Sequence, residues 1–392
     1  MHMTIGTPAG TCDRLFAECA AYRTIQRAVT GLFQRRGYCE LMTPEVEFYD
    51  VFTASGNPLP QQSMLKLIDR SSRILVMRPD NTTPIARVAA TKLRAMPLPQ
   101  RLYYDQTVFR SDDAHTGAQG EKPQCGIELI GAPGIRADLE VVAMAVQALE
   151  ATGLTEFQIE LGHAGYFTAL TDALGADGQT AHAMRQAVEN RSFAAFSDLL
   201  APYGKTPAGA ALKMLPRLFG GVEILGEARA LTPLPQAVAA LDYLAELYGE
   251  LARAGLGRHV RFDLSLVQGI DYYTGVVFRG YAQGAGTTVV SGGRYDGLVG
   301  RFGADVPATG FAVDVAALAS CLPQKEVQPP ETVIWYGRGR LGDALAAIAA
   351  LPDGTGVLSA AASCEMAEQE ARAHGAKTLL ILDGSEERSV AL

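Results

Sequence analysis

Apolar residues near the start of the chain recur at helical spacing, which predicts a helix that begins near Asp13 and is closed by Gly37. The apolar stripe of this helix consists of Leu15, Cys19, Tyr22, Val29 and Leu32. The stretch 37–47 then indicates a strand that stops at Pro44, because proline cannot donate a hydrogen bond to a neighbouring strand.

Further along the chain, apolar and polar residues alternate and predict a hairpin. Residues 64–69 and 73–77 form its two strands, with the turn at 70–72. The second strand runs into the turn Arg78-Pro79-Asp80-Asn81-Thr82-Thr83-Pro84, which is dense in hydrogen-bonding side chains. A helix from Ile85 to Arg94 is expected to follow.

Two longer strands are predicted at 102–110 and 124–131, separated by a glycine-containing loop over 111–123. On the second strand, alternation places four side chains on one face: Gln124, Gly126, Glu128 and Ile130. Burying a carboxylate is costly without a partner, so Glu128 marks this face as a candidate site.

The second half of the chain changes pattern twice. An amphipathic helix with Leu139, Val142, Val146 and Leu149 and a strand at 157–161 precede a region rich in alanine and leucine at 165–258, which predicts a helical insertion. Strands are then expected from Val260, at 287–291 and at 309–315, with a helix near 314–321. After a proline-containing linker at 323–330, the tail predicts a small α/β unit of three strands (333–336, 356–358, 378–382) and two helices (341–350, 363–374).

Composition narrows the class of protein. The chain has 392 residues, of which 48% are hydrophobic and 19% charged, so it is globular rather than disordered. Its net charge of -8 argues against broad nucleic-acid or membrane affinity. The six cysteines show no CxxC spacing, which fits the reducing cytoplasm and offers no metal site; no signal peptide or membrane-spanning run is seen, and no cofactor is expected.

The stretch 266–278 combines apolar and β-branched flanks with Gly269, a carboxylate and two adjacent tyrosines. A bent or bulged strand allows this, with Tyr272 and Tyr273 on opposite faces, one in the core and one in a cavity. Taken alone, the stretch favours an ordinary buried strand with a tyrosine pair.

Several polar residues fall at strand ends or on one strand face: Asp80, Thr82, Arg110, Gln124, Glu128 and Tyr273. Such a set suits a small zwitterion, because carboxylates and a hydroxyl hold an ammonium group, and an amide or arginine holds a carboxylate. A buried carboxylate with a phenol also grips a polar ring such as imidazole. The structural alternatives are that Arg110 pairs with Asp80 or Glu128 and that Asp80 caps a helix.

The order of these motifs resembles the catalytic core of class II histidyl-tRNA synthetase, over residues 10–320. Five segments carry the resemblance: 37–47 (the dimer-forming first motif), 78–82 (usually RPEGT), 109–128 (the second motif), 266–275 (usually LVRGLDYYTG) and 292–298 with 310–318 (the third motif). It implies an α+β fold with a central antiparallel sheet flanked by helices. The implied domains are a core at 1–164 and 259–322, a helical insertion at 165–258 and a small C-terminal α/β domain at 331–392.

This chain departs from the synthetase pattern where ATP would bind. Gln268 stands at the position of the catalytic arginine, and Ala317 at that of the arginine ending the third motif. A neutral amide cannot replace a charged fork, and losing such a donor typically costs ~10²–10³ in rate. The loop 111–123 has Lys122 as its one cation, and the tail is shorter than the family's anticodon-binding domain.

A synthetase-like chain without these arginines resembles the regulatory subunits of ATP phosphoribosyltransferase. The resemblance implies no catalytic residues, no tRNA binding and no membrane association, but a histidine site made of Asp80, Thr82, Arg110, Gln124, Glu128, Tyr272 and Tyr273. It also implies self-association as a dimer and a hetero-octamer with a short catalytic subunit, whose activity falls when L-histidine binds. The alternatives are an active histidyl-tRNA synthetase and another histidine-adenylating enzyme.

Overall fold

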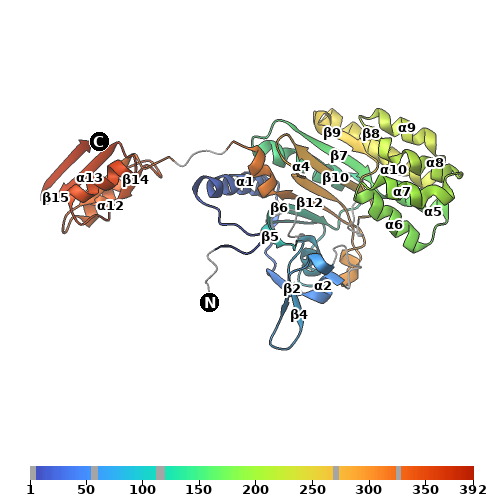
Figure 1. Ribbon diagram of the computed structural model, residues 1–392, viewed down its shortest axis with the longest axis horizontal. Coiled ribbons are helices and arrows are strands. Elements are labelled where there is room, and N and C mark those ends of the chain that lie inside the picture. The colour runs from blue at the N-terminus through green and yellow to red at the C-terminus, as the bar shows by residue number, and fades with distance from the viewer. Residues whose placement is uncertain (1–5, 54–60, 112–119, 268–272, 324–327) are drawn as a thin grey trace. The chain divides into compact units, whose positions relative to one another are not determined.

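The structure is a computed structural model that describes residues 6–53, 61–111, 120–267, 273–323 and 328–392 (Figure 1). The chain divides into two compact units, Met1–Gln324 and Lys325–Leu392. Within the described residues no helix is long and apolar enough to cross a membrane.

A nine-stranded sheet forms the centre of the first unit, in the order β1-β5-β6-β12-β11-β10-β7-β9-β8. Every neighbouring pair from β5 to β7 is antiparallel, which confirms the predicted central antiparallel sheet, whereas β1 lies parallel to β5 and β9 parallel to β7. The strands are β1 (Cys39–Glu40), β5 (Gln100–Phe109), β6 (Glu121–Ile130), β7 (Phe157–His163), β8 (Phe219–Gly220), β9 (Val260–Asp263), β10 (Val276–Ala282), β11 (Val290–Arg294) and β12 (Ala308–Asp314).

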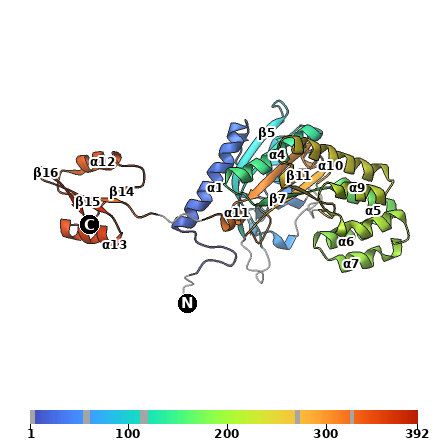
Figure 2. The same ribbon diagram turned by 90° about the horizontal axis from the view of Figure 1, so that it is seen from above.

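Helices cover both faces of this sheet. One face packs against α1 (Phe16–Arg35), α4 (Ile135–Ala151) and α11 (Val315–Cys321), and Figure 2 shows α1 and α4 running along it. Phe33 of α1 meets Phe311 of β12 edge-on at 5.7 Å between ring centroids. The opposite face is covered near β5 and β6 by α3 (Thr82–Ala90), whose Ile85 and Ala86 share a core with Tyr104. The candidate site lies on this second face.

The predicted hairpin is present as part of a small three-stranded sheet, β2-β4-β3. The short helix α2 (Tyr49–Thr53) comes directly after β2 in the sequence. The strands of this sheet are β2 (Val46–Phe48), β3 (Lys66–Ile68) and β4 (Ile74–Met77). Ser72 has a φ of 60°, and the Asp69 carboxylate accepts the backbone N–H groups of Ser71 and Arg73, which holds the turn.

Between β7 and β9 the chain is mostly helical, as the alanine-rich pattern predicts (Figure 1). The helices are α5 (Ala164–Leu174), α6 (Gly178–Glu189), α7 (Phe193–Leu200), α8 (Pro207–Met214), α9 (Glu223–Leu231) and α10 (Pro235–Arg253). The longest, α10, has a fully apolar stripe and packs against α4, α5 and β7, so the helices and the sheet share one continuous core.

The second unit has a four-stranded sheet in the order β14-β13-β15-β16. The three predicted strands are present as β13 (Thr332–Tyr336), β14 (Gly356–Leu358) and β15 (Thr378–Asp383), with helices α12 (Leu341–Ala349) and α13 (Cys364–Ala373). The expectation of only three strands is wrong: β16 (Glu386–Ala391) pairs antiparallel with β15. Its side chains are mostly polar and exposed, so no apolar pattern revealed it.

Two other sequence expectations need correction. The stretch 266–278 is not one bent strand, because Leu266 and Val267 lie outside β9 and β10 begins only at Val276; residues 268–272 lie outside the described part of the chain. The loop 111–123 is shorter than expected, since residues 121–123 belong to β6. Glu121 there pairs with Phe109 of β5, so cross-strand hydrogen bonding extends a strand that composition suggested was loop.

Candidate functional site

Six of the seven predicted site residues line one cavity of about 60 Å³ between the start of α3 and the sheet. They are Asp80, Thr82, Arg110, Gln124, Glu128 and Tyr273. The seventh, Tyr272, lies outside the described residues, as does Gln268. Segments more than 190 residues apart in sequence, from Asp80 to Tyr273, therefore meet at this point.

Glu128 lines the cavity and is only 1% exposed. The Thr82 hydroxyl donates to its Oε1 at 2.7 Å, and the Tyr295 hydroxyl donates to its Oε2. Its partner across the sheet is Gly310 of β12, where an added Cβ would lie 2.0 Å from Glu128 Oε2. Only glycine at position 310 leaves room for this carboxylate. Gly310 of the third motif and Glu128 of the second motif therefore form this part of the cavity together.

The pKa of Glu128 is raised to about 8, chiefly by burial and in smaller part by the nearby Asp80 carboxylate, against the opposing effect of the hydrogen bonds from Tyr295 and Thr82. No ion pair to Glu128 is present among the described residues. A carboxyl group buried without a cation favours a ligand that brings positive charge or N–H donors to it.

Asp80 lines the cavity and also forms hydrogen bonds with the first turn of α3. Its Oδ1 accepts the backbone N–H of Thr83 at 2.7 Å, and its Oδ2 accepts the Thr83 hydroxyl at 2.9 Å. Burial raises the pKa of this carboxyl group. Asp80 thus caps the first turn of α3, which is the structural alternative weighed for it from the sequence.

Arg110 pairs with neither carboxylate within the described residues. Its Nε donates to the Pro79 carbonyl oxygen at 3.0 Å, which ties β5 to the turn before α3. Arg110 lines the cavity, as does Gln124 of β6. These two side chains are the groups best suited to receive a carboxylate.

The Tyr273 ring packs against the sheet at Gly293 of β11, a residue without a side chain. An added Cβ at Gly293 would lie 2.8 Å from the Tyr273 ring. A second pairing of this kind occurs at Gly126, where a Cβ would lie 2.4 Å from the hydroxyl of Tyr104. Glycines on the central strands therefore make the hollow that the two aromatic rings and Glu128 occupy.

Seven residues of the cavity lining were not predicted as site residues, among them Asn81, Tyr104 and Tyr295. Asn81 and Tyr295 sit inside quoted motifs, so their proximity to other motif residues was available as a signal. Tyr104 is the register partner of Gly126, and alternation along 102–110 places it on the site face once that register is known.

The position corresponding to the third-motif arginine is Ala317 in the first turn of α11. Ala317 is 5% exposed, and its backbone N–H donates to Asp314 Oδ1 at 2.9 Å. It therefore contributes to the main core and to a helix cap, and it presents no charge toward the cavity.

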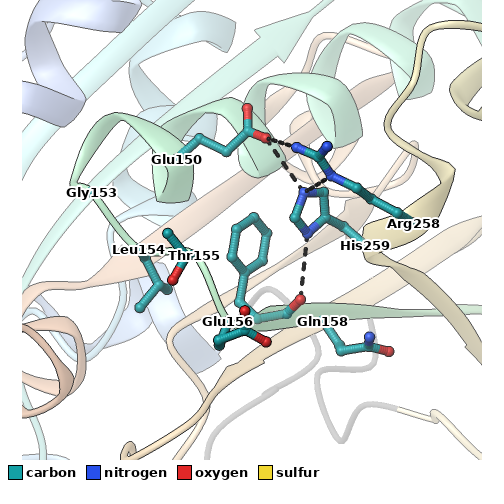
Figure 3. Close-up of a pocket in the computed structure, with 9 residues that line it drawn as sticks. Glu150, Gly153, Leu154, Thr155, Glu156, Gln158, Arg258 and His259 are labelled. Carbon is teal, nitrogen blue, oxygen red and sulfur yellow. Dashed lines mark hydrogen bonds and ion pairs between the residues drawn. The ribbon is translucent and has the colours of Figure 1, made fainter.

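A larger hollow, of about 560 Å³, lies elsewhere, where α4 ends and β7 begins (Figure 3). Arg258 Nε donates to His259 Nε2 at 2.9 Å, and Arg258 also pairs with Glu150 at 3.2 Å. The His259 ring stacks on Phe157 with centroids 4.2 Å apart. Glu150, Arg258 and His259 of this hollow contact one another, and none of its lining residues is a predicted site residue, so the smaller cavity remains the candidate site.

The fold and the cavity define a protein of the class II synthetase-like kind. The sequence model described as histidyl-tRNA synthetase matches residues 10–318. A solved structure of an ATP phosphoribosyltransferase regulatory subunit/histidyl-tRNA synthetase from Bacillus halodurans superposes with a TM-score of 0.87, at 30% identity, covering 98% of this chain and 100% of that one.

Two curated relatives of this chain are named regulatory subunits and not synthetases. The ATP phosphoribosyltransferase regulatory subunit of Clostridium kluyveri is 41% identical over 80% of this chain and 81% of its own. That of Clostridium acetobutylicum is 39% identical over 88% of this chain and 86% of its own. The chain belongs to the family of ATP phosphoribosyltransferase regulatory subunits, as its motif departures predicted.

Proposed function

We propose that this chain binds L-histidine in the cavity around Glu128 and thereby regulates a short catalytic subunit of ATP phosphoribosyltransferase, at the first step of histidine biosynthesis. The observation that carries the proposal is Glu128 itself: a buried carboxyl group with a raised pKa, held by two hydroxyls and lacking a cation among the described residues. The imidazole ring of histidine brings an N–H donor from which the Glu128 carboxyl group can accept a hydrogen bond, and the ligand's ammonium group is left for other groups of the cavity.

The rest of the cavity suits the same ligand. Arg110 and Gln124 lie where a carboxylate can be received, and the Tyr273 ring offers an aromatic face to an imidazole. The effector acts by linkage: L-histidine binds the inhibited arrangement of the assembly more tightly than the active one, and the equilibrium shifts accordingly.

The proposed assembly is a dimer of this chain within a hetero-octamer of four regulatory and four catalytic subunits in the cytoplasm. The small sheet β2-β4-β3 supports self-association, because it exposes large apolar side chains that water disfavours: Val46, Phe48, Leu67, Ile68 and Ile74. Its first strand, β2, begins inside the stretch 37–47 that resembles the dimer-forming motif. No tRNA or membrane partner is proposed.

Reconstitution tests this function. The chain is mixed with a short catalytic subunit, and product formation from ATP and phosphoribosyl pyrophosphate is followed with and without L-histidine. The chain is expected to raise the activity of the catalytic subunit, and L-histidine to lower it. Glu128→Gln is expected to preserve the activation but lose the response to L-histidine.

Two results count against the proposal. Absence of any effect on the catalytic subunit would remove the regulatory role. Histidine-dependent pyrophosphate exchange by the purified chain would instead support the alternative of a histidine-adenylating enzyme, which the buried Ala317 disfavours.

A further inference from the structure

The side chain of Asn81, at the start of α3, is 2% exposed and lines the candidate cavity. Its Nδ2 donates to the backbone carbonyl oxygen of Gln106 and to Oε1 of Gln124, each at 3.4 Å. The Gln106 carbonyl can only accept a hydrogen bond, so it fixes which end of the Asn81 amide is the nitrogen. The oxygen Oδ1 must therefore point to the other side.

Asn81 Oδ1 is buried and has no hydrogen-bond donor among the described residues. Buried acceptors without a donor are rare in folded proteins, because each loses its hydrogen bond to water without replacement. Such an atom in the wall of a cavity is positioned to accept a hydrogen bond from a molecule bound there.

The other amide and carboxylate oxygens in the described lining already have donors. Both Asp80 oxygens are occupied by Thr83, and both Glu128 oxygens by Thr82 and Tyr295. Gln124 Oε1 accepts from Asn81 itself. Of these oxygens in the described part of the cavity, Asn81 Oδ1 is thus the one still in need of a donor.

We propose that Asn81 Oδ1 accepts a hydrogen bond from the ammonium group of a bound α-amino acid, and that Asn81 also orients Gln124 for the ligand's carboxylate. By donating to Gln124 Oε1, Asn81 leaves the amide nitrogen of Gln124 to serve as a donor. The inference rests on the proposed function, which supplies L-histidine as the amino acid. In the turn that this segment resembles, RPEGT, the position of Asn81 is glycine, so the acceptor is a feature of this chain.

A ligand comparison tests the role of Asn81. L-histidine and imidazole-propionate, which lacks the ammonium group, are titrated by calorimetry into the full-length wild-type chain and into Asn81→Gly. Glycine is tolerated at helix N-caps, so this variant is expected to keep the fold. The wild-type chain is expected to prefer L-histidine by about ten- to hundredfold, the range for a hydrogen bond to a charged group.

In Asn81→Gly, the affinity for L-histidine is expected to fall by about ten- to hundredfold more than the affinity for imidazole-propionate. The ratio of the two affinities should therefore approach one. Asn81→Asp keeps an acceptor and is expected to keep the preference. Asn190→Ala, an asparagine at the end of α6, is the remote control.

The outcomes separate the two claims. If Asn81→Gly weakens both ligands equally, so that the preference persists, Asn81 only holds the turn and the inference is overturned. If Asn81→Asp loses the preference while its circular dichroism stays native, the acceptor role is overturned too. If the wild-type chain binds neither ligand, the proposed function itself fails and the inference fails with it.

Discussion

Glu128 shows how neighbouring residues decide what a carboxyl group can do. Two hydroxyls satisfy its oxygens, and a glycine on the next strand makes space for it, but nothing among the described residues neutralises its charge. Its pKa of about 8 means that the neutral form predominates at pH 7 unless a cation is bound. A cation that bound beside Glu128 would therefore favour release of its proton.

This pKa gives a prediction for stability. Because the pKa of Glu128 rises from 4.5 to about 8 on folding, its contribution to stability is complete below pH 4.5 and is lost as pH rises through about 8. Glu128→Gln cannot ionise. We expect the free energy of unfolding of the wild type, relative to Glu128→Gln, to fall between pH 5 and pH 8 by on the order of 1 kcal/mol per pH unit.

Urea denaturation of both proteins at pH 5, 6.5 and 8, without L-histidine, measures this difference. Groups with lowered pKa values, such as Glu140, titrate below the window and are shared by both proteins. A difference that stays constant with pH would show that Glu128 is already ionised in the folded protein.

The sequence predicted which face of β6 carries Gln124 and Glu128, because alternation along a strand is a local property. It could not decide between ligand contact and helix capping for Asp80, since both use the same residue type at the same place. That choice depends on whether the Thr83 hydroxyl turns toward the carboxylate, and it does. Asn81 was not predicted because the feature that singles it out, the lack of a hydrogen-bond donor to its Oδ1 among the described residues, is visible only in the structure.

Elements far apart in sequence are joined behind the cavity by one buried ion pair. Arg294, at the end of β11, contacts Asp138 of α4 through Nε at 3.0 Å and through a second nitrogen at 2.9 Å. Tyr243 of α10 donates to the same carboxylate at 2.5 Å. Thr274 donates its backbone N–H to the Arg294 carbonyl oxygen, so the segment that carries Tyr273 is held by the same residue.

Tyr243 therefore has an effect on stability that its partly exposed position would not suggest. We expect Tyr243→Phe to lower the free energy of unfolding by roughly 1–3 kcal/mol, because Asp138 is 1% exposed and loses a donor to its charge. Tyr248→Phe on the same helix is the matched control: Tyr248 packs edge-on against Phe262, and its hydroxyl has no hydrogen bond to the described residues.

Urea denaturation at neutral pH compares the two variants with the wild type. The control is expected to change the free energy of unfolding by less than about 0.5 kcal/mol. Equal effects of the two substitutions would mean that Tyr243 acts through packing and not through Asp138.

Helices and strands whose apolar residues recur at a regular spacing could be predicted from the sequence. Strands that exist because they form hydrogen bonds with a neighbouring strand could not. The stripe on α10 and the helical composition of the insertion follow from spacing alone. The strand β16 exists because β15 offers it a hydrogen-bonding edge, and its own residues are mostly polar. The same holds for the first residues of β6, which are strand only because β5 extends opposite them.

At the scale of the whole molecule, the chain consists of two units, and the described residues of the candidate cavity belong to the first. All described residues of the cavity belong to the unit ending at Gln324, whose core is continuous from α1 to α11. The unit that begins at Lys325 has its own core, with Val333, Leu379 and Ile381 buried between its sheet and α13. Each unit thus buries its own apolar surface, the condition for folding independently.

From this division we expect a chain that ends at residue 323 to fold and to bind L-histidine with an affinity within about threefold of the full-length chain, a difference under about 1 kcal/mol. Calorimetric titration measures the affinity, and circular dichroism establishes that the shortened chain is folded. The same shortened chain, mixed with the catalytic subunit, reveals whether the second unit contributes to regulation. A folded chain that has lost its affinity for L-histidine would show that the second unit helps to form the effector site.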